Sequence, residues 1–446
     1  MDQPHSPARS VSTALLTDRY ELTMVQAALE SGTAERRCVF EVFTRRLPPG
    51  RRYGVVAGTG RFLEALADFR FTDAELEYLR DGGVTNSRML DYLANYRFTG
   101  DIYGYAEGEM FFPGSPVLVV ESTFAEGVLL ETLALSMLNY DSAVASAASR
   151  MTSAAGSRPC LEMGGRRAHE QAAVAAARAS VVAGFTGTSN LQAGRRYGLE
   201  TIGTAAHSFT LLHDDESAAF EAQVAAYGPN TTLLVDTYDI AEGVRRAIAA
   251  AGTELDAVRL DSGDLGTVAR EVREQLDSLG AAGTKIVVSS DLDEHAIAAL
   301  AVAPVDSYGV GTSVVTGSGA PTCGMVYKLV SREGAGGQME PVEKASSAKS
   351  SVGGRKNAAR RLDEAGRAAE EVVLAGAGPD WTPAEDDLRA LQVPLVVGGQ
   401  VESTFTGQQG VANAARRHQA SRAELTPYAR RLSAGDPAIE TVHQPL

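Results

Sequence analysis

The sequence predicts an α/β protein, with a β/α barrel in the middle of the chain and a mixed α/β domain before it. The prediction begins from six short apolar runs between residues 184 and 313, each of which ends in small or polar residues. The polar residues that mark these ends lie 18 to 30 positions apart, and a strand–helix–strand unit needs about 30 residues. The markers are Ser189, His207, Asp236, Asp261, Asp291 and Thr312.

Two architectures have strands and helices at this spacing: a closed β/α barrel and an open doubly wound sheet. Both bind ligands at the carboxyl ends of their strands, so the markers are expected on one face in either case. Helical patterns separate the runs, for example over Thr267–Leu279 and Glu294–Val302. We favour the barrel, because polar residues follow every run rather than a single switch point.

The chain ends are expected to contain both helices and strands. Residues 18–30 predict a helix that presents Leu22, Val25, Ala28 and Leu29 on one face, with Thr17 or Asp18 as its N-cap. The remaining expected elements are a strand at Cys38–Phe43, helices at Gly60–Asp68 and Asp73–Leu79, strands within Thr99–Thr123, a helix at His169–Ala183, a hairpin or loop at Ser331–Asn357 and a helix at Gly410–Arg417. We expect an N-terminal α/β domain over 1–125, the barrel with the active site over 126–330, and a C-terminal segment over 331–446 that packs with the N-terminal domain.

The composition excludes several classes of protein. With 446 residues, 44% of them hydrophobic, the chain has enough apolar material for a sizeable core, which excludes a wholly disordered protein. No run of about 18 apolar residues is present, and the first 14 residues lack the apolar core of a secretory signal. Cys38, Cys160 and Cys323 are far apart and form no CxxC, which argues against a disulfide framework and a Cys-rich zinc site. We therefore expect a soluble, cytoplasmic protein.

The net charge of −15 argues against general binding to nucleic acid or to an anionic membrane, since both rely on cationic surfaces. One segment departs from this balance: residues 344–361 contain six basic residues and no acid. Two interpretations stay open, contact with ATP or another polyphosphate and a solvated hairpin. The basic residues are Lys344, Lys349, Arg355, Lys356, Arg360 and Arg361.

The run Arg259–Asp264 (RLDSGD) contains one arginine, two carboxylates, a hydroxyl and a glycine. An arginine grips a planar carboxylate or a phosphate in bidentate fashion. Aspartates hold Mg²⁺ or the hydroxyls of a ribose. A solvated turn has the same composition, so both interpretations remain.

The run Ser307–Ser313 (SYGVGTS) places two glycines and several hydroxyls at a predicted strand end. Bare backbone N–H groups there can surround a phosphate. The run is neither a Walker motif nor a complete GxGxxG, and glycine-rich turns are common, so it is weak evidence by itself.

His207 lies among small residues, with Thr204 and Ser208 nearby. A histidine can act as base, acid, metal ligand or phosphoryl acceptor, although a lone histidine is more often structural. Arg166 and Arg167 can hold an anion or remain ordinary surface charges. Together, the residues at the strand ends suit a phosphorylated, Mg²⁺-chelated small molecule, without naming a reaction.

The motifs resemble, in their order along the chain, those of the nicotinate phosphoribosyltransferase family. The resemblance spans about residues 15 to 360, and its motifs are specific as a set rather than singly. They are LLTDRYELTM from Leu15, the loop Glu162–Arg167, the turn Gly187–Asn190, Gly203–Phe209, Arg259–Asp264, Ser289–Asp293, Tyr308–Thr312 and Lys344–Lys356.

The resemblance implies a reaction and a fold. Members of the family join nicotinate to 5-phosphoribosyl 1-diphosphate, giving nicotinate mononucleotide and diphosphate in NAD salvage. They require Mg²⁺ and couple the step to ATP hydrolysis through a phosphorylated histidine. The implied fold is the type II phosphoribosyltransferase one, an irregular β/α barrel plus an α/β domain built from both chain ends. Members are usually homodimers with active sites at the interface.

The same resemblance assigns roles to single residues. His207 is expected to be the phosphohistidine, and Arg259 to bind the nicotinate carboxylate and a substrate phosphate region. Asp261 and Asp291 are expected to hold the ribose or Mg²⁺-diphosphate. The other expected substrate contacts are Asp18 and Tyr20 from the neighbouring subunit, Met163 and Arg166 at the pyridine ring, Thr204 and Ser208, and Gly311 and Thr312 at the 5-phosphate.

Ser189 bears on specificity. Relatives that use nicotinamide carry an aspartate in the GT-x turn, where it accepts from the amide. A serine hydroxyl can instead donate to the nicotinate carboxylate, which an aspartate would repel. The sequence therefore favours the acid over the amide. A relative that uses nicotinamide, and a catalytically silent homologue that only binds phosphoribosyl compounds, are the alternatives, whereas quinolinate is disfavoured as a substrate.

Overall fold

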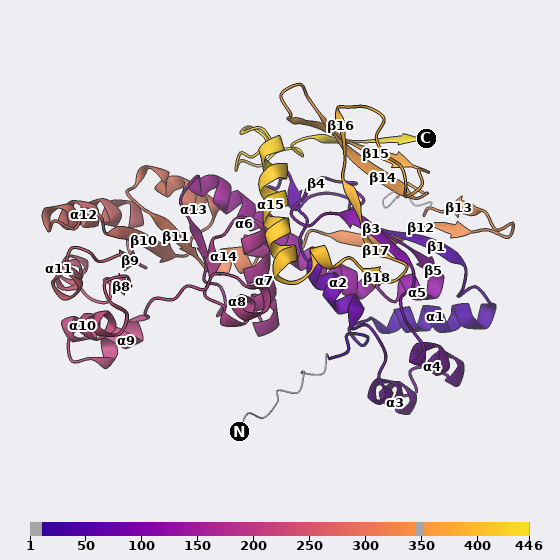
Figure 1. The fold of residues 1–446 in the computed structure, drawn as a ribbon, viewed down its shortest axis with the longest axis horizontal. Helices are drawn as coiled ribbons and strands as arrows, with labels where there is room; N and C mark the ends of the chain where they lie inside the picture. The colour runs from indigo at the N-terminus through magenta and orange to yellow at the C-terminus, as the bar shows by residue number, and fades with distance from the viewer. Residues whose placement is uncertain (1–10, 345–351, 446) are drawn as a thin grey trace. The chain divides into compact units, whose positions relative to one another are not determined.

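The computed structural model describes residues 11–344 and 352–445 and is drawn in Figure 1. The chain forms two compact units. Unit 1 combines Met1–Ser142 with Thr322–Leu446, and unit 2 is Ala143–Pro321. The expectation of one domain built from both chain ends is thus confirmed in unit 1. The division at 125 and 330 stays a prediction.

Unit 2 contains a six-stranded sheet in which all pairings are parallel. The strands are β6 (Cys160–Glu162), β7 (Gly187–Thr188), β8 (Thr232–Leu234), β9 (Ala257–Leu260), β10 (Lys285–Ser290) and β11 (Ser307–Val310). Their spatial order is β7-β6-β11-β10-β9-β8. This is the chain order of a barrel with one seam open, between β7 and β8. The predicted irregular α/β barrel is therefore confirmed as a half-barrel.

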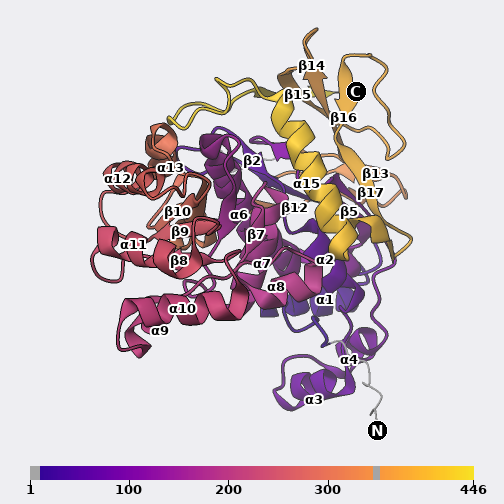
Figure 2. The same ribbon diagram turned by 60° about the vertical axis from the view of Figure 1, so that its left-hand side comes forward.

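Helices connect these strands, and Figure 2 shows α11 and α12 beside β8–β10. Four of them begin at an aspartate whose side chain accepts a backbone N–H: Asp215, Asp239, Asp264 and Asp293. Such caps satisfy donors that the helix itself leaves unpaired. The helical elements of unit 2 are α7 (Glu170–Val182), α8 (Leu191–Tyr197), α9 (His207–Leu212), α10 (Glu216–Tyr227), α11 (Ile240–Ala251), α12 (Leu265–Ser278), α13 (Glu294–Ala299), η1 (Leu300–Val302) and α14 (Thr312–Val315).

Five of the six predicted runs contain strands, but residues 201–208 do not. Thr201 forms only an isolated bridge with Thr188, and the chain enters α9 at His207. This run lies in the open seam between β7 and β8 and does not pair with β8, so the sheet is not extended there. The sixth strand, β6, has three residues and was not among the predicted runs.

Unit 1 is built on a seven-stranded antiparallel sheet of order β13-β12-β1-β5-β3-β17-β18. Its strands are β1 (Arg37–Thr44), β3 (Asp101–Tyr105), β5 (Leu118–Thr123), β12 (Met325–Glu333), β13 (Met339–Pro341), β17 (Gln392–Val397) and β18 (Gln400–Val401). The strand predicted at 38–43 and the hairpin predicted within 331–357 are both present. A four-stranded sheet of β16 (Leu388–Ala390), β14 (Lys356–Leu362), β15 (Ala368–Ala375) and β19 (Glu440–Pro445) and a small pair of β2 (Gly54–Val55) and β4 (Met110–Phe111) complete the unit.

The predicted N-terminal helices are also present. In α1 (Arg19–Ser31), Asp18 is the N-cap and accepts from the backbone of Tyr20. The other helices are α2 (Thr59–Ala67), α3 (Asp73–Asp81), α4 (Ser87–Ala94), α5 (Phe124–Val128) and α15 (Gly407–Glu424), with the short η2 (Ser403–Phe405) before α15. The longest, α6 (Glu131–Ala155), was not predicted. Residues 141–150 of α6 are all buried, so no exposed face gives this stretch the periodicity of an amphipathic helix.

Three residues of the basic segment are buried: Arg355, Lys356 and Arg360. Both interpretations are wrong for these residues, because they are neither solvated nor exposed to ATP. Lys356 Nζ donates to Glu41 Oε2 at 2.8 Å with both side chains buried, and Arg355 Nε donates to Glu121 Oε1 at 2.6 Å. The reason is that β14 begins at Lys356 and its first five residues are buried. Lys349 lies outside the described residues.

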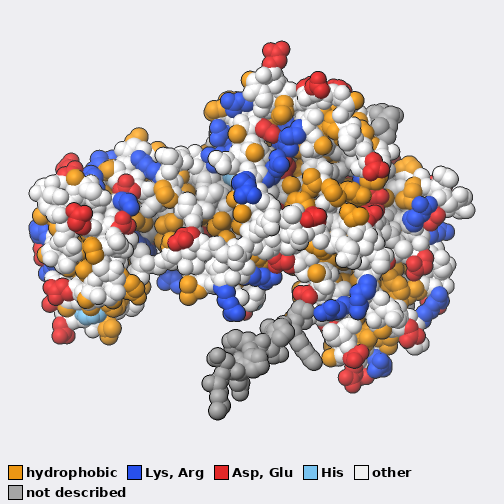
Figure 3. All heavy atoms as spheres, viewed as in Figure 1, with side chains coloured by type: hydrophobic (Ala, Val, Ile, Leu, Met, Phe, Trp, Pro, Cys, Tyr) orange, Lys and Arg blue, Asp and Glu red, His pale blue; other side chains and the backbone are white. Residues whose placement is uncertain are grey.

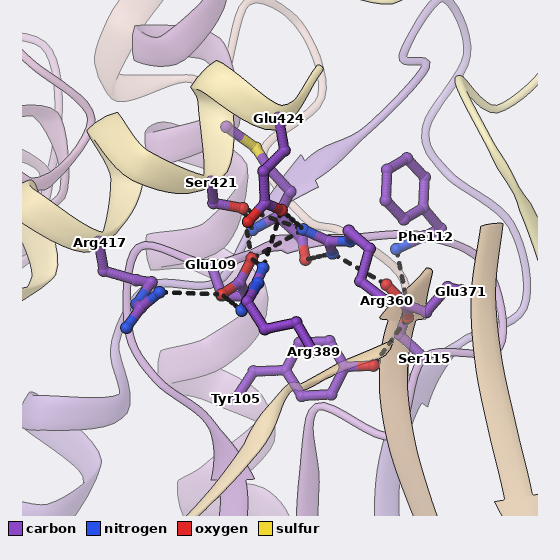
Figure 4. A network of polar contacts seen from close by, with 11 residues as sticks. Tyr105, Glu109, Phe112, Ser115, Arg360, Glu371, Arg389, Arg417, Ser421 and Glu424 are labelled. Carbon is purple, nitrogen blue, oxygen red and sulfur yellow. Dashed lines mark hydrogen bonds and ion pairs between the residues drawn. The ribbon is translucent and has the colours of Figure 1, made fainter. Parts of the chain in front are cut away.

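Arg360 is the centre of a buried charge network, shown in Figure 4. Its guanidinium donates to Glu109 Oε1 at 2.8 Å, to Glu371 Oε2 at 2.9 Å and to Glu424 Oε2 at 3.1 Å. Arg389 also pairs with Glu109 and Glu424. Burial alone would lower the pKa of Arg360, but the surrounding carboxylates raise it above its ordinary value. The network joins β14, β15, β16 and α15 to the segment that carries β4.

Acidic and basic side chains are interspersed on the face drawn in Figure 3. Among the described residues, no helix has the length and apolar character needed to cross a membrane.

Candidate active site

A polar cleft of about 240 Å³ lies at the carboxyl ends of the parallel strands of unit 2. Each segment that lines it is the end of a strand or directly follows one, as expected for this class of sheet. The lining residues are Met163, Arg166, Arg167, Arg259, Asp261, Ser289, Ser290, Asp291, Gly309, Gly311 and Thr312. The structure therefore brings seven predicted site residues into one cleft: Met163, Arg166, Arg259, Asp261, Asp291, Gly311 and Thr312.

Strand register explains the centre of this cleft. Arg259 on β9 stands opposite Val287 on β10, and Ser289 lies two residues beyond Val287. Residues two apart on a strand point to the same face, so Arg259, Asp261 and Ser289 project together. Arg259 Nε donates to Ser289 Oγ at 2.7 Å, Ser289 Oγ donates to Asp261 Oδ1 at 2.5 Å, and Arg259 Nη2 donates to Asp261 Oδ1 at 3.0 Å.

This triangle fixes the charge of Asp261. Burial alone would raise the pKa of Asp261, but the hydrogen bond from Ser289 and the Arg259 guanidinium outweigh it and lower the pKa below its ordinary value. Asp261 is therefore an anion at neutral pH. Arg259 is also anchored on the other side, where Nη1 donates to Thr204 Oγ1 at 3.1 Å.

His207 lies beside this centre, at the first turn of α9. Its Nδ1 is 3.1 Å from Thr237 Oγ1, and its Nε2 is 3.9 Å from Asp261 Oδ2. The imidazole is 41% exposed. A threonine hydroxyl can donate or accept, so this contact holds the ring in place with either nitrogen protonated, and Nε2 lies on the side of Asp261. The structure thus brings together His207, Asp261 and Arg259, although 201–208 is not a strand.

Asp236 contributes to the site in a way that the sequence analysis did not assign. It follows β8 and its Oδ2 accepts from Asp261 N at 2.8 Å and from Ser262 Oγ at 2.7 Å. Its Oδ1 is buried and has no hydrogen-bond partner among the described residues. The signal in the sequence that could have identified Asp236 was its position as a polar residue at the end of a predicted strand. Asp236 fixes the loop that carries Asp261.

The other wall is closely packed at Gly309. A Cβ on Gly309 would lie 2.8 Å from Met163 Sδ and 3.1 Å from Ser289 Cβ, so a side chain at this point of β11 would displace Met163. Ser290, at the end of β10, has a φ of 150°, a strained value for a residue with a side chain. Strained backbone of this kind is typical of binding sites.

Glu162 supports the floor of the site at the end of β6. Its carboxylate accepts from the backbone of Gly164 and from the hydroxyl of Thr188. Burial raises the pKa of Glu162. The Glu162 carboxyl group therefore holds the turn that precedes Arg166, which is a structural role beside the cleft.

Five predicted contacts are placed elsewhere. Ser189 is exposed after β7, where its backbone N–H donates to Glu162 O at 2.8 Å. Thr204 touches Arg259, and Ser208 is exposed on α9. Asp18 and Tyr20 belong to unit 1. Tyr20 is 43% exposed, and burial together with the neighbouring Glu131 raises the pKa of its hydroxyl.

The cleft offers oxygen ligands of the kind that Mg²⁺ prefers. Asp261 and Asp291 line it and supply carboxylate oxygens. No cluster of three His, Cys, Asp or Glu side chains with metal-ligand geometry occurs in the described part of the chain. The donor set fits an ion held by one or two carboxylates and substrate phosphates, which is how Mg²⁺ is commonly bound.

Two family models match the chain. One is described as the nicotinate phosphoribosyltransferase (NAPRTase) N-terminal domain and matches residues 15–139. The other is described as the nicotinate phosphoribosyltransferase (NAPRTase) family and matches residues 159–371, which include every residue of the cleft.

Individual relatives agree with these models. The chain is 56% identical over 446 residues to nicotinate phosphoribosyltransferase pncB1 of Mycobacterium tuberculosis, covering 98% of this chain and 96% of the relative. It is 37% identical over 374 residues to nicotinate phosphoribosyltransferase of Bacillus subtilis, covering 82% and 76%. The crystal structure of human nicotinic acid phosphoribosyltransferase matches with a TM-score of 0.81 at 26% identity, covering 96% of this chain and 97% of the human one.

Proposed function

The chain belongs to the nicotinate phosphoribosyltransferase family, and we propose that the cleft of unit 2 is where it performs the family's reaction. The reaction transfers the phosphoribosyl group from 5-phosphoribosyl 1-diphosphate to the ring nitrogen of nicotinate. The products are nicotinate mononucleotide and diphosphate, in NAD salvage. The observation that carries the assignment to this cleft is the Arg259–Ser289–Asp261 triangle with His207 beside it.

Arg259 binds the nicotinate carboxylate in this proposal. Its guanidinium is fixed by Ser289, Asp261 and Thr204, and a fixed guanidinium needs no reordering to accept a planar carboxylate. Met163 and Arg166 line the same cleft and contact the pyridine ring. Thr204 and Ser208 supply hydroxyls beside it.

The 5-phosphate end binds at the turn after β11. Gly311 and Thr312 line the cleft there, and bare backbone N–H groups suit phosphate oxygens. Asp261 and Asp291 hold Mg²⁺ together with the diphosphate of the donor. When bound, the ion neutralises the charge that develops on the departing diphosphate.

His207 is the phosphoryl acceptor that couples ATP to the transfer. Its Nε2 lone pair attacks the γ-phosphorus of ATP, the bond to the β-γ bridging oxygen breaks, and ADP leaves. The phosphohistidine is later hydrolysed to orthophosphate and free imidazole. While present, its negative charge stabilises the positive charge that the anomeric carbon develops as diphosphate departs. The support for this role is the contact of Nδ1 with Thr237, which directs Nε2 towards the cleft.

A second copy of the chain completes the site in this proposal. Tyr20 and Asp18 reach into the partner's cleft, and Tyr20 stacks on the pyridine ring. The support is that Tyr20 is 43% exposed within a single chain, which leaves its ring accessible to a neighbouring molecule. We expect a homodimer, and a cytoplasmic one, since all three cysteines are buried free thiols.

The test is product formation from 5-phosphoribosyl 1-diphosphate, Mg²⁺ and either nicotinate or nicotinamide, with and without ATP. We expect mononucleotide from nicotinate and stimulation of its formation by ATP. The variant His207→Ala should lose the stimulation and the ATP-dependent, acid-labile phosphorylation of the protein. ADP release at the wild-type rate from this variant would assign the acceptor to another residue.

Ser189 sets the preference for the acid. Its hydroxyl donates to the nicotinate carboxylate, whereas an aspartate at this position would repel it. Ser189→Asp should therefore lower turnover of nicotinate more than turnover of nicotinamide. Equal activity of wild type and Ser189→Asp on nicotinate would refute the role. Ser189→Ala removes the hydroxyl without adding a charge and should lower turnover of nicotinate less than Ser189→Asp does.

A further inference from the structure

Among the residues that the structure describes, two that are not glycine have a positive φ: Ser290 at 150° and Ser318 at 49°. Ser318 lies in the turn after α14, between Gly317 with a φ of 62° and Gly319 with a φ of 80°. Glycine adopts this left-handed conformation without cost, whereas the Cβ of a serine opposes it. A serine in a turn that suits glycine indicates that its side chain has a role of its own.

The hydroxyl of Ser318 has a charged partner. Its Oγ donates to Glu294 Oε2 at 2.7 Å. Glu294 is the first residue of α13, and its Oε1 accepts from Arg150 Nε of α6 at 2.9 Å. The Arg150 and Glu294 side chains are 5% and 4% exposed. A hydrogen bond to an ionised carboxylate is stronger than one between neutral groups, so the hydroxyl binds the turn firmly to α13.

The backbone of Ser318 joins the same turn to the predicted phosphate end of the cleft. Ser318 N donates to Ser313 O at 2.6 Å, and Thr316 N donates to Thr312 O at 3.1 Å. These bonds close α14 at its C-terminal end. Thr312, the first residue of α14, lines the cleft. The position of Ser318 is therefore transmitted to Thr312 through a single turn of helix.

On the other side of the hydrogen bond, Glu294 follows the loop of Asp291. Asp291 lines the cleft and lies three residues before Glu294. The strands that precede the two loops, β10 and β11, are paired as far as Ser290 and Val310. Beyond these residues the sheet no longer fixes the spacing of the loops. The hydrogen bond from Ser318 to Glu294 joins them there, and the strained Ser290 lies where β10 ends.

We propose that Ser318 is a positioning residue for the phosphoribosyl donor, acting through Glu294 on the two loops that hold it. This role rests on the function proposed above, in which Thr312 binds the 5-phosphate and Asp291 helps to hold the Mg²⁺-diphosphate. The donor carries these groups at its two ends, so it binds best when the two loops have the correct spacing. Nicotinate binds at Arg259 on β9, which the hydrogen bond does not touch. Loss of the Ser318 hydroxyl should therefore weaken binding of the donor and not of nicotinate.

Ser318→Gly tests this role, because it removes the hydroxyl and leaves a residue that suits the turn. Binding of 5-phosphoribosyl 1-diphosphate with Mg²⁺ to the full-length protein is measured by calorimetry, without nicotinate or ATP. We expect the affinity of Ser318→Gly to be about ten-fold lower than that of wild type. In the turnover assay, KM for the donor should rise by about the same factor, while KM for nicotinate and kcat should stay unchanged. A loss of folded protein would lower kcat instead.

Two further variants separate the hydroxyl from the strain. Ser318→Ala also lacks the hydroxyl but retains a Cβ at positive φ, so it should bind the donor as weakly as Ser318→Gly and unfold at a lower temperature than Ser318→Gly. Gly319→Ala is the matched control. It keeps the hydroxyl and places a Cβ at a φ of 80°, where the structure describes no atom within 4 Å beyond the chain neighbours. It should lower the unfolding temperature and leave the affinity for the donor unchanged.

Three results would overturn the proposal: donor affinity of folded Ser318→Gly equal to that of wild type, an equal loss of affinity in Gly319→Ala, and an equal rise in KM for nicotinate. With normal wild-type turnover, each of them leaves the proposed function intact. Absence of donor binding to the wild-type protein would instead overturn the proposed function, and the role of Ser318 with it.

Discussion

Two arginines of this chain are each surrounded by carboxylates and hydroxyls, yet their surroundings differ. Arg360 in unit 1 is fully buried, and its partners Glu109 and Glu371 are buried with it. Arg259 in unit 2 is 13% exposed, and its partner Asp261 is 32% exposed. Both lie on strands, but Arg259 is near the carboxyl end of a parallel strand and borders a cleft.

The difference shows that location, rather than composition, separates a structural charge cluster from a reactive one. The buried cluster contributes to the stability of unit 1, since a buried charge is tolerated only when it is paired. The cleft cluster leaves one side open to solvent, where a substrate can replace water. Breaking the first should change folding, and breaking the second should change turnover.

The largest expected effect is on the stability of the Arg360 variant. Arg360→Met leaves Glu109 and Glu371 as buried carboxylates without their cation, and losing one member of a buried pair costs about 3–5 kcal/mol. Urea unfolding followed by circular dichroism measures the loss. The matched control is Arg361→Met, whose ion pairs are partly exposed and should contribute no more than about 1 kcal/mol. Equal losses in the two variants would contradict the comparison.

The second prediction concerns the cleft. Arg259→Gln should lower kcat/KM for nicotinate by about 10²–10³, because it removes a fixed donor that binds charge in the site. The unfolding midpoint should change little. Arg245→Gln, which breaks an exposed pair with Glu242 on α11, is the control and should keep wild-type turnover. A large stability loss in Arg259→Gln would place this arginine in the same class as Arg360.

Much of unit 2 could be predicted because its strands end in polar residues that recur at the spacing of βα units. Asp236, Asp261, Asp291 and Thr312 all follow strands. The sequence analysis missed α6 for a physical reason. A helix with all of its middle residues buried shows no amphipathic period.

The basic segment illustrates what local sequence cannot reveal. Arg360 and its partner Glu109 are 251 residues apart in the chain. A contact between residues so far apart in the chain depends on the complete fold. The local sequence therefore shows the basic residues without their acidic partners, and the segment resembles an isolated cationic patch. The role of Asp236 was missed for a similar reason, since it depends on hydrogen bonds to a loop 25 residues away.

The third prediction uses pH to examine the buried network. Burial alone would raise the pKa of Glu109, but Arg360 and Arg389 lower it to about 2. A carboxyl group whose pKa is lower in the folded state stabilises the fold above its unfolded pKa of about 4.5, and this stability is lost as pH falls towards 2. The stability difference between wild type and Glu109→Gln should therefore shrink as pH falls from about 5 to about 3. A constant difference across that range would contradict the ionised state of Glu109.

The smallest expected effect concerns the hydrogen bond that positions the His207 imidazole beside the cleft. Thr237 Oγ1 is 3.1 Å from His207 Nδ1, and the contact orients the imidazole ring. Thr237→Val keeps the shape and removes the hydroxyl, at a cost of about 1 kcal/mol for one hydrogen bond. The rate of His207 phosphorylation by ATP should fall about five-fold.

The conservative variant Thr237→Ser separates this positioning role from packing. It keeps the hydroxyl and should restore the rate of phosphorylation, while ATP-independent transfer should be unchanged in both variants. If Thr237→Val and Thr237→Ser are equally slow, the methyl group rather than the hydrogen bond matters. In that case packing rather than the Thr237 hydroxyl orients the imidazole, and the positioning role of Thr237 would be refuted.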